Sequence, residues 1–222
     1  MSDPATLRLL TWLSPAFPTG AFAYSHAVEW AVESGDITNG PTLQAWLETL
    51  LHHGSARADA ILLRHAHRAA NDLETLATLA ELALATALAA ERRAETIHQG
   101  NAFIAAATPW HPAALQALAD KIGDIPYPIT VGAMAGANDI AEDTAAAALL
   151  HGFAASLISA AVRIIPLGQS TGLAVLAALE PTILSVAAAT KTATLDDLGT
   201  ATWRADLAAM RHETQYTRLF RS

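Results

Sequence analysis

Near the end of the chain the sequence reads HETQY, from His212 to Tyr216, which differs by one residue from the helix of a zinc protease. In the pattern H-E-x-x-H two histidines one turn apart hold zinc, and the Glu activates a water molecule. Tyr216 occupies the place of the second histidine, and zinc requires three or four ligands. We therefore interpret His212 and Glu213 as a surface pair, and the protease hypothesis is rejected.

A second candidate for metal chemistry is the E-x-x-H step formed by Glu95 and His98. Di-iron helical bundles use this step twice, but no second copy occurs in this chain. Glu91, Glu95 and His98 would share one face of a helix, since they follow one another at steps of four and three residues. A polar stripe beside Arg92 and Arg93 is the favoured interpretation, and a helical metalloenzyme that uses these three ligands is the alternative.

Composition limits the remaining chemistry. The 222 residues include no cysteine, so thiolate metal sites, cysteine nucleophiles and disulfides are excluded. The formal net charge is -8 and only two lysines occur, Lys121 and Lys191, which argues against a nucleic-acid groove. Only 15% of the residues are charged and 52% are hydrophobic, so we expect partner proteins to cover part of the surface.

Helices must position these side chains, because helical periodicity dominates and no alternating strand pattern appears. Apolar residues recur at helical spacing over residues 43–51 and again over residues 115–122. Glycine and proline stops divide the chain into about nine or ten helices of ordinary length. Neither a repeat nor a linker of disordered composition is visible, so residues 1–222 are expected to form one all-α domain, a helical bundle around central apolar helices.

The longest uncharged stretch, residues 145–162, is expected to form a core helix. Its 18 residues reach the minimum for a membrane span, but the stretch contains a histidine and two serines and is rich in alanine. Residues 141–190 predict two central helices that meet at Pro166. Residues 42–107 predict three or four helices around them that contain more charged residues, with a break near Gly54.

Two further features have residue types suited to recognition. In LSPAFPTGAFAYSHAVEW, residues 13–30, prolines and Gly20 fix a turn beside which aromatic side chains are displayed. An equally good interpretation is that these aromatic residues pin the loop to the core. Arg163 is the only Lys or Arg between Lys121 and Lys191, and it either caps the last carbonyls of the apolar helix or meets a partner.

The last thirteen residues, MRHETQYTRLFRS, present a geometric problem. A buried face of the last helix is predicted by three apolar residues at helical spacing, Trp203, Leu207 and Met210. A continuous helix would put Tyr216 and the apolar residues after it on nearly the opposite side. Either the helix breaks near His212, or the second group faces a partner. We expect this tail, residues 211–222, to dock on a partner and to be mobile when free.

Three stretches together resemble one family, that of the urease accessory protein UreF. They are LSPAFPTGAFAYSHAVEW at residues 13–30, RIIPLGQSTG at residues 163–172 and the tail at residues 210–222. Because they lie in the same order at the start, middle and end, the resemblance covers essentially the whole chain, and YTRLFRS is its most specific part. One departure is Ala27, which stands after His26 where this family often has glycine.

The resemblance implies an all-helical cytoplasmic scaffold that is not an enzyme. Proteins similar to UreF dimerise, bind UreD (also called UreH) and recruit the GTPase UreG, and the assembly delivers nickel to apo-urease. The chain itself is expected to hold no metal or other cofactor stably, and neither nucleic acid nor a membrane is expected among its partners. Modulation of the UreG GTPase is a further hypothesis. A general helical adaptor unrelated to nickel is the second alternative.

The same resemblance supplies the residues of a partner-binding site, and no catalytic, cofactor-binding or metal-binding residue. In the turn segment they are Pro18, Gly20, Phe22, Tyr24 and Ser25. At the helix junction they are Arg163 and Gln169, together with Pro166 and Gly168. In the tail, which is expected to order against UreD, they are Arg211, His212, Glu213, Tyr216, Arg218, Leu219, Phe220 and Arg221.

Overall fold

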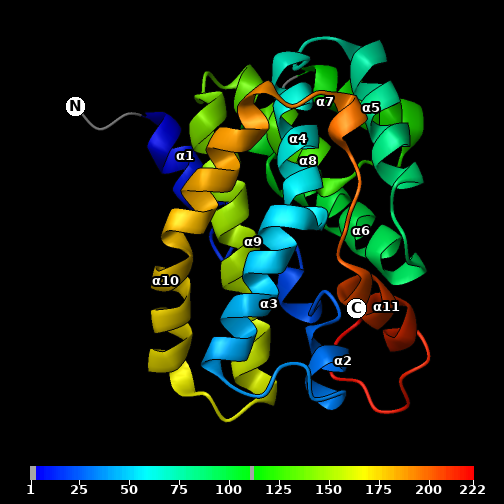
Figure 1. Ribbon diagram of the computed structural model, residues 1–222. Coiled ribbons are helices and arrows are strands. Elements are labelled where there is room, and N and C mark those ends of the chain that lie inside the picture. The colour runs from blue at the N-terminus through cyan, green and yellow to red at the C-terminus, as the bar shows by residue number, and fades with distance from the viewer. Residues whose placement is uncertain (1–3, 111–112) are drawn as a thin grey trace.

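The computed structural model describes residues 4–110 and 113–222, and all regular structure in these ranges is helical (Figure 1). The all-α class is thereby confirmed, and the eleven α-helices in these ranges are close to the nine or ten expected. They are α1 (Pro4–Trp12), α2 (Val28–Glu33), α3 (Gly40–His53), α4 (Ser55–Arg68), α5 (Leu73–Ala85), α6 (Ala90–Ala106), α7 (Ala113–Ile122), α8 (Tyr127–Ala137), α9 (Glu142–Ile164), α10 (Gly168–Ala189) and α11 (Trp203–His212). Short 3-10 helices are η1 (Ala21–Ala23), η2 (Thr108–Trp110), η3 (Thr190–Thr192) and η4 (Leu195–Asp197).

Local sequence sets several of the helix ends. At the start of α3 the Asn39 side chain accepts a hydrogen bond from the Thr42 N–H at 3.0 Å, and the Thr42 hydroxyl oxygen accepts one from the Asn39 N–H at 3.0 Å. Asp72 caps α5 in the same way, since it accepts from the Thr75 N–H at 3.1 Å. Gly54 has an extended backbone between α3 and α4, as the sequence predicts.

Helix α8 lies at the centre of the larger core, packed between α4 and α6. Glycines allow this close packing. A Cβ on Gly132 of α8 would lie 2.3 Å from the carbonyl oxygen of Leu63, and a Cβ on Gly100 of α6 would lie 1.9 Å from that of Ile125. Backbones can approach so closely only where no side chain intervenes, so these glycines fix the distances among α4, α6 and the segment before α8.

Helices α9 and α10 meet at Pro166, as predicted, but only α9 is central. It packs against α4, α8, α2 and α10, whereas α10 runs along one edge of the molecule (Figure 1). Both helices are long and apolar enough to cross a membrane by length and composition, with 50% of that stretch buried in α9 and 33% in α10. The expectation of two central helices is therefore wrong for α10, which leaves apolar side chains on its outer face.

The buried face of α11 also differs from the prediction. The three residues expected to be buried are largely exposed, with exposed fractions of 79% for Trp203, 57% for Leu207 and 46% for Met210. The face that packs instead contains Ala208 and Ala209. Their small side chains let α11 approach α2 and α6 closely, which a face built from Trp and Met would prevent.

Candidate partner-docking site

The tail follows a definite path beside α2 (Figure 1). Helix α11 ends at His212, which is the first of the two alternatives, a break near that residue, and the chain then turns back toward Glu29. This buried carboxylate accepts hydrogen bonds from two consecutive tail amides, the N–H of Leu219 at 2.7 Å and that of Phe220 at 3.0 Å. Mobility of the free tail is a statement about dynamics and stays a prediction, but the residues that would hold it are now identified.

Two carboxylates hold the imidazole of His212 from opposite sides. Its Nδ1 lies 2.6 Å from Oε2 of Glu91, and its Nε2 lies 3.2 Å from Oε2 of Glu29. The side chain is fully buried, so the interpretation of His212 as half of a surface pair is wrong. Glu91 also accepts from Arg218 at 2.5 Å, and Glu213 accepts the first backbone N–H of α6 at 2.8 Å. These contacts tie the tail to α2 and α6.

Phe220 is buried, which corrects the expectation that it faces a partner. Its ring centroid lies 4.3 Å from the guanidinium carbon of Arg163, a cation–π distance. Arg163 Nη2 donates to the carbonyl oxygen of Phe22 at 2.8 Å, and its Nε donates to that of Ser159 at 3.3 Å. Arg163 therefore caps a carbonyl of α9 and also contacts the turn segment and the tail, and its contact with a partner stays a prediction.

The turn segment pairs with the last residues of the chain. The backbone N–H of Ser25 donates to the carbonyl oxygen of Ser222 at 2.8 Å, and the N–H of Arg221 donates to that of Ala23 at 2.8 Å. Both Ser25 and Ser222 are buried. Two of the three stretches singled out in the sequence thus form one continuous structure, although nearly the whole chain separates them.

Around the region where the tail packs against α2 and the turn segment, several large apolar side chains point outward. Those on α11, the tail and the turn segment are Trp203, Leu207, Met210, Tyr216, Leu219 and Phe22. Arg211 and Arg221 lie among them, exposed and without an ion pair to the described residues. Aromatic residues together with arginine are the types enriched at protein interfaces, so the arrangement suits docking of another protein.

The metalloenzyme alternative does not survive the geometry. Glu91 is taken up by the tail, Glu95 binds Arg92 and accepts from the Ser222 hydroxyl at 2.6 Å, and His98 Nδ1 lies 2.8 Å from the Tyr24 hydroxyl. Within residues 4–110 and 113–222 no group of three His, Asp or Glu side chains converges on a possible metal position. Each proposed ligand is instead occupied by a neighbouring protein group.

The backbone turns sharply where the segment enters α2. His26 has a φ of 54° and Ala27 a φ of 63°, both in the left-handed region. Ala27 is the position where the resembled family often has glycine, and the positive φ is the physical reason for that preference. This turn directs Glu29 toward the tail and the His26 ring toward the interior.

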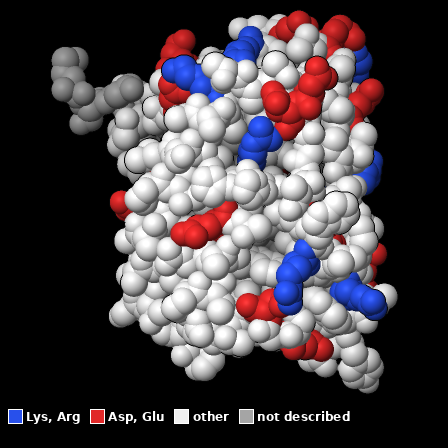
Figure 2. All heavy atoms as spheres, in the orientation of Figure 1, with Lys and Arg blue, Asp and Glu red and all other residues white. Residues whose placement is uncertain are grey.

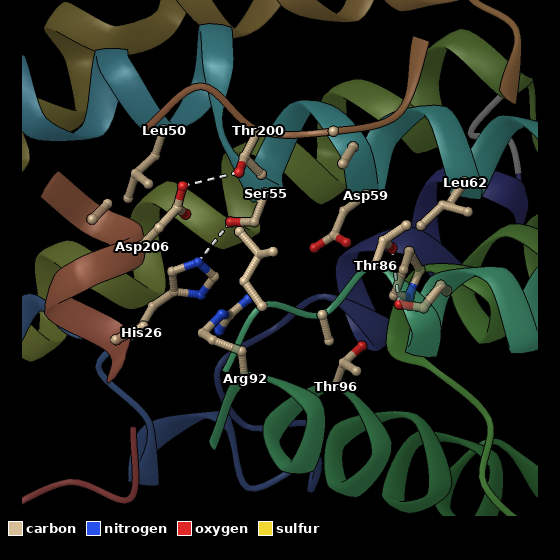
Figure 3. Close-up of a pocket in the computed structure, with 18 residues that line it drawn as sticks. His26, Leu50, Ser55, Asp59, Leu62, Thr86, Arg92, Thr96, Thr200 and Asp206 are labelled. Atoms are coloured by element: carbon tan, nitrogen blue, oxygen red, sulfur yellow. Dashed lines mark hydrogen bonds between the residues drawn. The ribbon is translucent and has the colours of Figure 1, made fainter. Parts of the chain in front are cut away.

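The His26 ring lies at one side of a small cavity between α4, α6 and α11 (Figure 3). Its Nε2 is 2.6 Å from the Ser55 hydroxyl, and its Nδ1 is 3.7 Å from Oε1 of Glu95, which pairs with Arg92. Asp59 projects into the same cavity from α4. The cluster therefore brings acid, base and arginine together inside an otherwise apolar protein.

Burial shifts the titration of this cluster. Burial first, and repulsion by Arg92 second, lower the pKa of His26 to about 4, although Glu95 opposes both. Burial raises the pKa of Asp59 to about 7. Burial alone would raise the pKa of Glu95, but Arg92, His26 and Ser222 together hold this pKa far below the usual range. At neutral pH the interior therefore contains a neutral imidazole beside an ionised Glu95.

The remaining residues of the predicted partner-binding set lie in different surroundings, and two residues outside that set organise the site. Pro18 and Gly20 line a large cavity behind the turn segment, while Gln169 is exposed at the start of α10 and its side chain makes no hydrogen bond with the described part of the chain. Sequence reasoning missed Glu29, which organises the tail, and Asp59. The available signal for Glu29 was a lone acid within the apolar run AVEWAV.

Comparison with known proteins gives a consistent result. A family model described as UreF matches residues 37–180, more than half of the chain. The urease accessory protein UreF of Rhodopseudomonas palustris (strain BisB18) is 50% identical over 222 residues, covering 98% of this chain and 92% of the relative. The proteins of the same name from Bradyrhizobium sp. (strain BTAi1 / ATCC BAA-1182) and Azorhizobium caulinodans are each 48% identical and cover all of this chain, with 94% and 97% of their own lengths matched.

The helical fold, the surface of outward aromatic residues and these relatives define an accessory protein of urease and not an enzyme. Within that class the chain belongs to the UreF family.

Proposed function

We propose that this chain is a non-enzymatic scaffold that binds UreD (UreH) and recruits the GTPase UreG, so that nickel is inserted into apo-urease. The observation that carries the proposal is the group of exposed apolar residues on α11 and the tail, above all Trp203, Tyr216 and Leu219. Exposed aromatic residues of this size belong at interfaces, because solvent exposure of such a group is unfavourable without a partner.

Charge adds a requirement for the partner. Arg211 and Arg221 are unpaired beside the exposed aromatic residues, whereas Arg218 is already engaged by Glu91. In the view of Figure 2, basic side chains lie over the lower right of the molecule, where α11 is found. The surface of UreD that receives the tail should therefore combine an apolar groove with carboxylates at its rim.

A second surface supports self-association into a homodimer. The outer face of α10 exposes Leu173 and Leu184, and α1 exposes Leu7 and Leu10. Figure 2 shows a broad area over α10 and α3 with very few charged side chains. A helix with only 33% of its apolar stretch buried in its own fold is better accounted for by a second copy than by water. We assign this face to the dimer and the tail face to UreD.

Nickel is handled by the complex in this proposal and is not stored by the chain. The interior offers His26, Asp59 and Glu95, but His26 contacts the Ser55 hydroxyl and Glu95 pairs with Arg92, and no group of three side chains among the described residues could hold a metal ion. We place the protein in the cytoplasm, without nucleic acid or membrane among its partners. By bracing UreG against this scaffold, the chain would also modulate GTP hydrolysis.

The decisive experiment is co-purification with UreD and UreG from cells that express all three proteins. The double variant Tyr216→Ala/Leu219→Ala removes only exposed side chains, and we expect UreD to bind about tenfold more weakly to it. Leu173→Ala/Leu184→Ala on α10 is the matched control, which should abolish dimers in gel filtration and leave binding of UreD to the monomer intact. Equal retention of UreD by the tail variant and the wild type would contradict the assignment.

Urease activation separates the scaffold from a general adaptor. In cells that carry the other urease genes and lack the native chain, the wild type should restore nickel content to urease, and the tail variant should not. The nickel content of purified urease is the readout. An adaptor unrelated to nickel would leave that content unchanged whichever variant is supplied.

A further inference from the structure

A cavity of about 510 Å³ lies behind the turn segment, between that segment, α6 and α9. Its volume falls within the range of small-molecule sites, which is about 300–1,000 Å³. Phe22, Ser156 and Arg163 belong to its lining and are exposed. The cavity is therefore open to solvent, and a small molecule can enter it without movement of the chain.

One wall of the cavity is aromatic and is supported from behind. Trp12, Phe17 and Tyr127 line the cavity, and all three pack against the ring of Phe103, with centroid distances of 6.1, 5.1 and 5.9 Å. Phe103 is itself completely buried. Because a single buried ring supports the three others, this apolar wall is formed before any ligand arrives.

The charged side chains of the lining balance one another. Among the described residues that line the cavity, Asp59 and Glu95 are acidic, and Arg92 and Arg163 are basic. Glu95 pairs directly with Arg92. An ion of either sign would therefore gain little net attraction here, while its loss of hydration would be uncompensated. The cavity favours an uncharged molecule.

The hydroxyl of Tyr127 is a donor available to such a molecule, because it makes no hydrogen bond with the described part of the chain. The position of Tyr127 is fixed by its backbone N–H, which donates to the Thr96 hydroxyl oxygen at 3.1 Å, and by its packing on Phe103. Burial raises the pKa of Tyr127, so the hydroxyl keeps its proton. The Tyr24 hydroxyl, in contrast, is already engaged with His98 Nδ1 at 2.8 Å.

We propose that this cavity binds a small, uncharged and largely apolar molecule that carries a carbonyl oxygen, and that the Tyr127 hydroxyl donates a hydrogen bond to that oxygen. The aromatic wall supplies most of the affinity, and the hydroxyl orients the ligand. An aromatic ketone is the simplest ligand of this class. The inference goes beyond the scaffold role and does not rest on it, because one chain builds the whole site and the purified protein alone can be tested.

Prodan, an uncharged naphthalene ketone whose fluorescence responds to apolar surroundings, is a suitable probe. We expect saturable binding to the purified chain. Tyr127→Phe removes only the hydroxyl and should weaken the binding of Prodan about five- to tenfold, as expected for the loss of one hydrogen bond. The matched ligand is the analogue in which CH2 replaces the carbonyl group. Its affinity, measured by displacement of Prodan, should differ less than about twofold between wild type and Tyr127→Phe.

A second variant fills the cavity and leaves Tyr127 in place. A Cβ at Gly152, on the α9 wall, would meet nothing within 4 Å, so Gly152→Leu adds a side chain at the cavity wall without a clash. It should weaken the binding of Prodan by about tenfold or more. Thr144→Leu adds the same side chain at an exposed position of α9 outside the cavity and should change the affinity less than about twofold.

Thermal unfolding provides an independent readout of the same site. Prodan at a concentration well above its Kd should raise the melting temperature of the wild type and of Thr144→Leu, and should raise that of Gly152→Leu much less. The proposal is overturned if Prodan does not bind saturably, or if Gly152→Leu binds it as tightly as Thr144→Leu does. It is also overturned if Tyr127→Phe leaves the preference for Prodan over the CH2 analogue unchanged.

Discussion

Glu29 Oε2 lies 3.2 Å from His212 Nε2, so an acid in the first turn of α2 is paired with the last residue of α11. Because both side chains are buried, their polar atoms must be satisfied by each other and by nearby polar groups. Glu29 meets this need by accepting from the amides of Leu219 and Phe220 as well. A single carboxylate therefore organises the end of the chain.

Replacement of this carboxylate should loosen the tail. We expect Glu29→Gln to lower the free energy of unfolding by about 2–3 kcal/mol, because the amide keeps the size but loses the charge that three donors share. Chemical denaturation measures the loss, and amide exchange at Leu219 and Phe220 should become faster. Glu48→Gln on α3 is the control, since the Glu48 carboxylate accepts a hydrogen bond from Gln44 within its own helix. Equal effects of the two variants would rule out the role given to Glu29.

Local signals in the sequence predict much of the helical fold. The break at Gly54, the junction at Pro166 and the end of α11 near His212 all follow from chemistry within a few residues. Short-range rules suffice there because a cap or a stop acts on its own turn. The packing of the tail could be predicted only in part. Helical periodicity indicates that one helix cannot bury both the apolar residues of α11 and those of the tail, but it does not show which of the two groups is buried.

Longer-range packing explains the failures. Helical spacing of Trp203 with two other apolar residues predicts that it is buried, yet Ala208 and Ala209 take that place, since only small residues allow close helix contact. His212 and Glu29 come from distant parts of the chain, so no sequence window contains their interaction. Hydropathy disfavours burial of either residue alone, and only the pairing makes burial possible.

The left-handed turn before α2 is the site of a stabilising substitution. Ala27 has a φ of 63°, which is unfavourable for a residue with a Cβ and accessible to glycine. We expect Ala27→Gly to raise the free energy of unfolding by about 1 kcal/mol. The greater flexibility of glycine in the unfolded chain reduces this gain. Ala45→Gly, at an exposed position inside α3, should lower it by about 1 kcal/mol. Destabilisation by both substitutions would show that the turn at Ala27 is unstrained.

Close helix packing is tested by a pair of glycines. A Cβ at Gly100 would meet the carbonyl oxygen of Ile125 at 1.9 Å, whereas a Cβ at Gly152 in α9 would meet nothing within 4 Å. Gly100→Ala should therefore cost more than about 3 kcal/mol, since backbone must move. Gly152→Ala should stabilise by about 0.5–1 kcal/mol through helix propensity. Thermal unfolding of both variants separates the outcomes, and similar melting temperatures would contradict the packing of α6 described above.

The partly buried carboxyl of Asp59, which lines the small cavity, predicts a pH dependence of stability. Burial raises its pKa from 3.8 to about 7, so between these values the folded protein binds more protons than the unfolded chain. The free energy of unfolding contributed by this group therefore falls as the pH rises from about 4 to 7. Asp59→Asn removes this titration. We therefore expect the free energy of unfolding of the variant to rise relative to that of the wild type as the pH increases over this range. The relative gain should reach about 1–2 kcal/mol above pH 7, after allowance for water in the cavity.

The quantity to measure is the difference in free energy of unfolding between the variant and the wild type, because His26 titrates in both proteins. The pKa of His26 is lowered to about 4, so its contribution to stability is lost as the pH falls from about 6.5, whichever residue stands at position 59. Urea unfolding at pH 5 and pH 8 then isolates Asp59. A stability difference that is the same at both pH values would mean that Asp59 is ionised throughout and that the cavity is wet enough to solvate it. Asp72→Asn should show a pH dependence of the opposite sign. Hydrogen bonds to Thr75 lower the pKa of the Asp72 carboxyl, which is the exposed cap of α5, so replacement of this carboxylate should lower the free energy of unfolding more at pH 8 than at low pH.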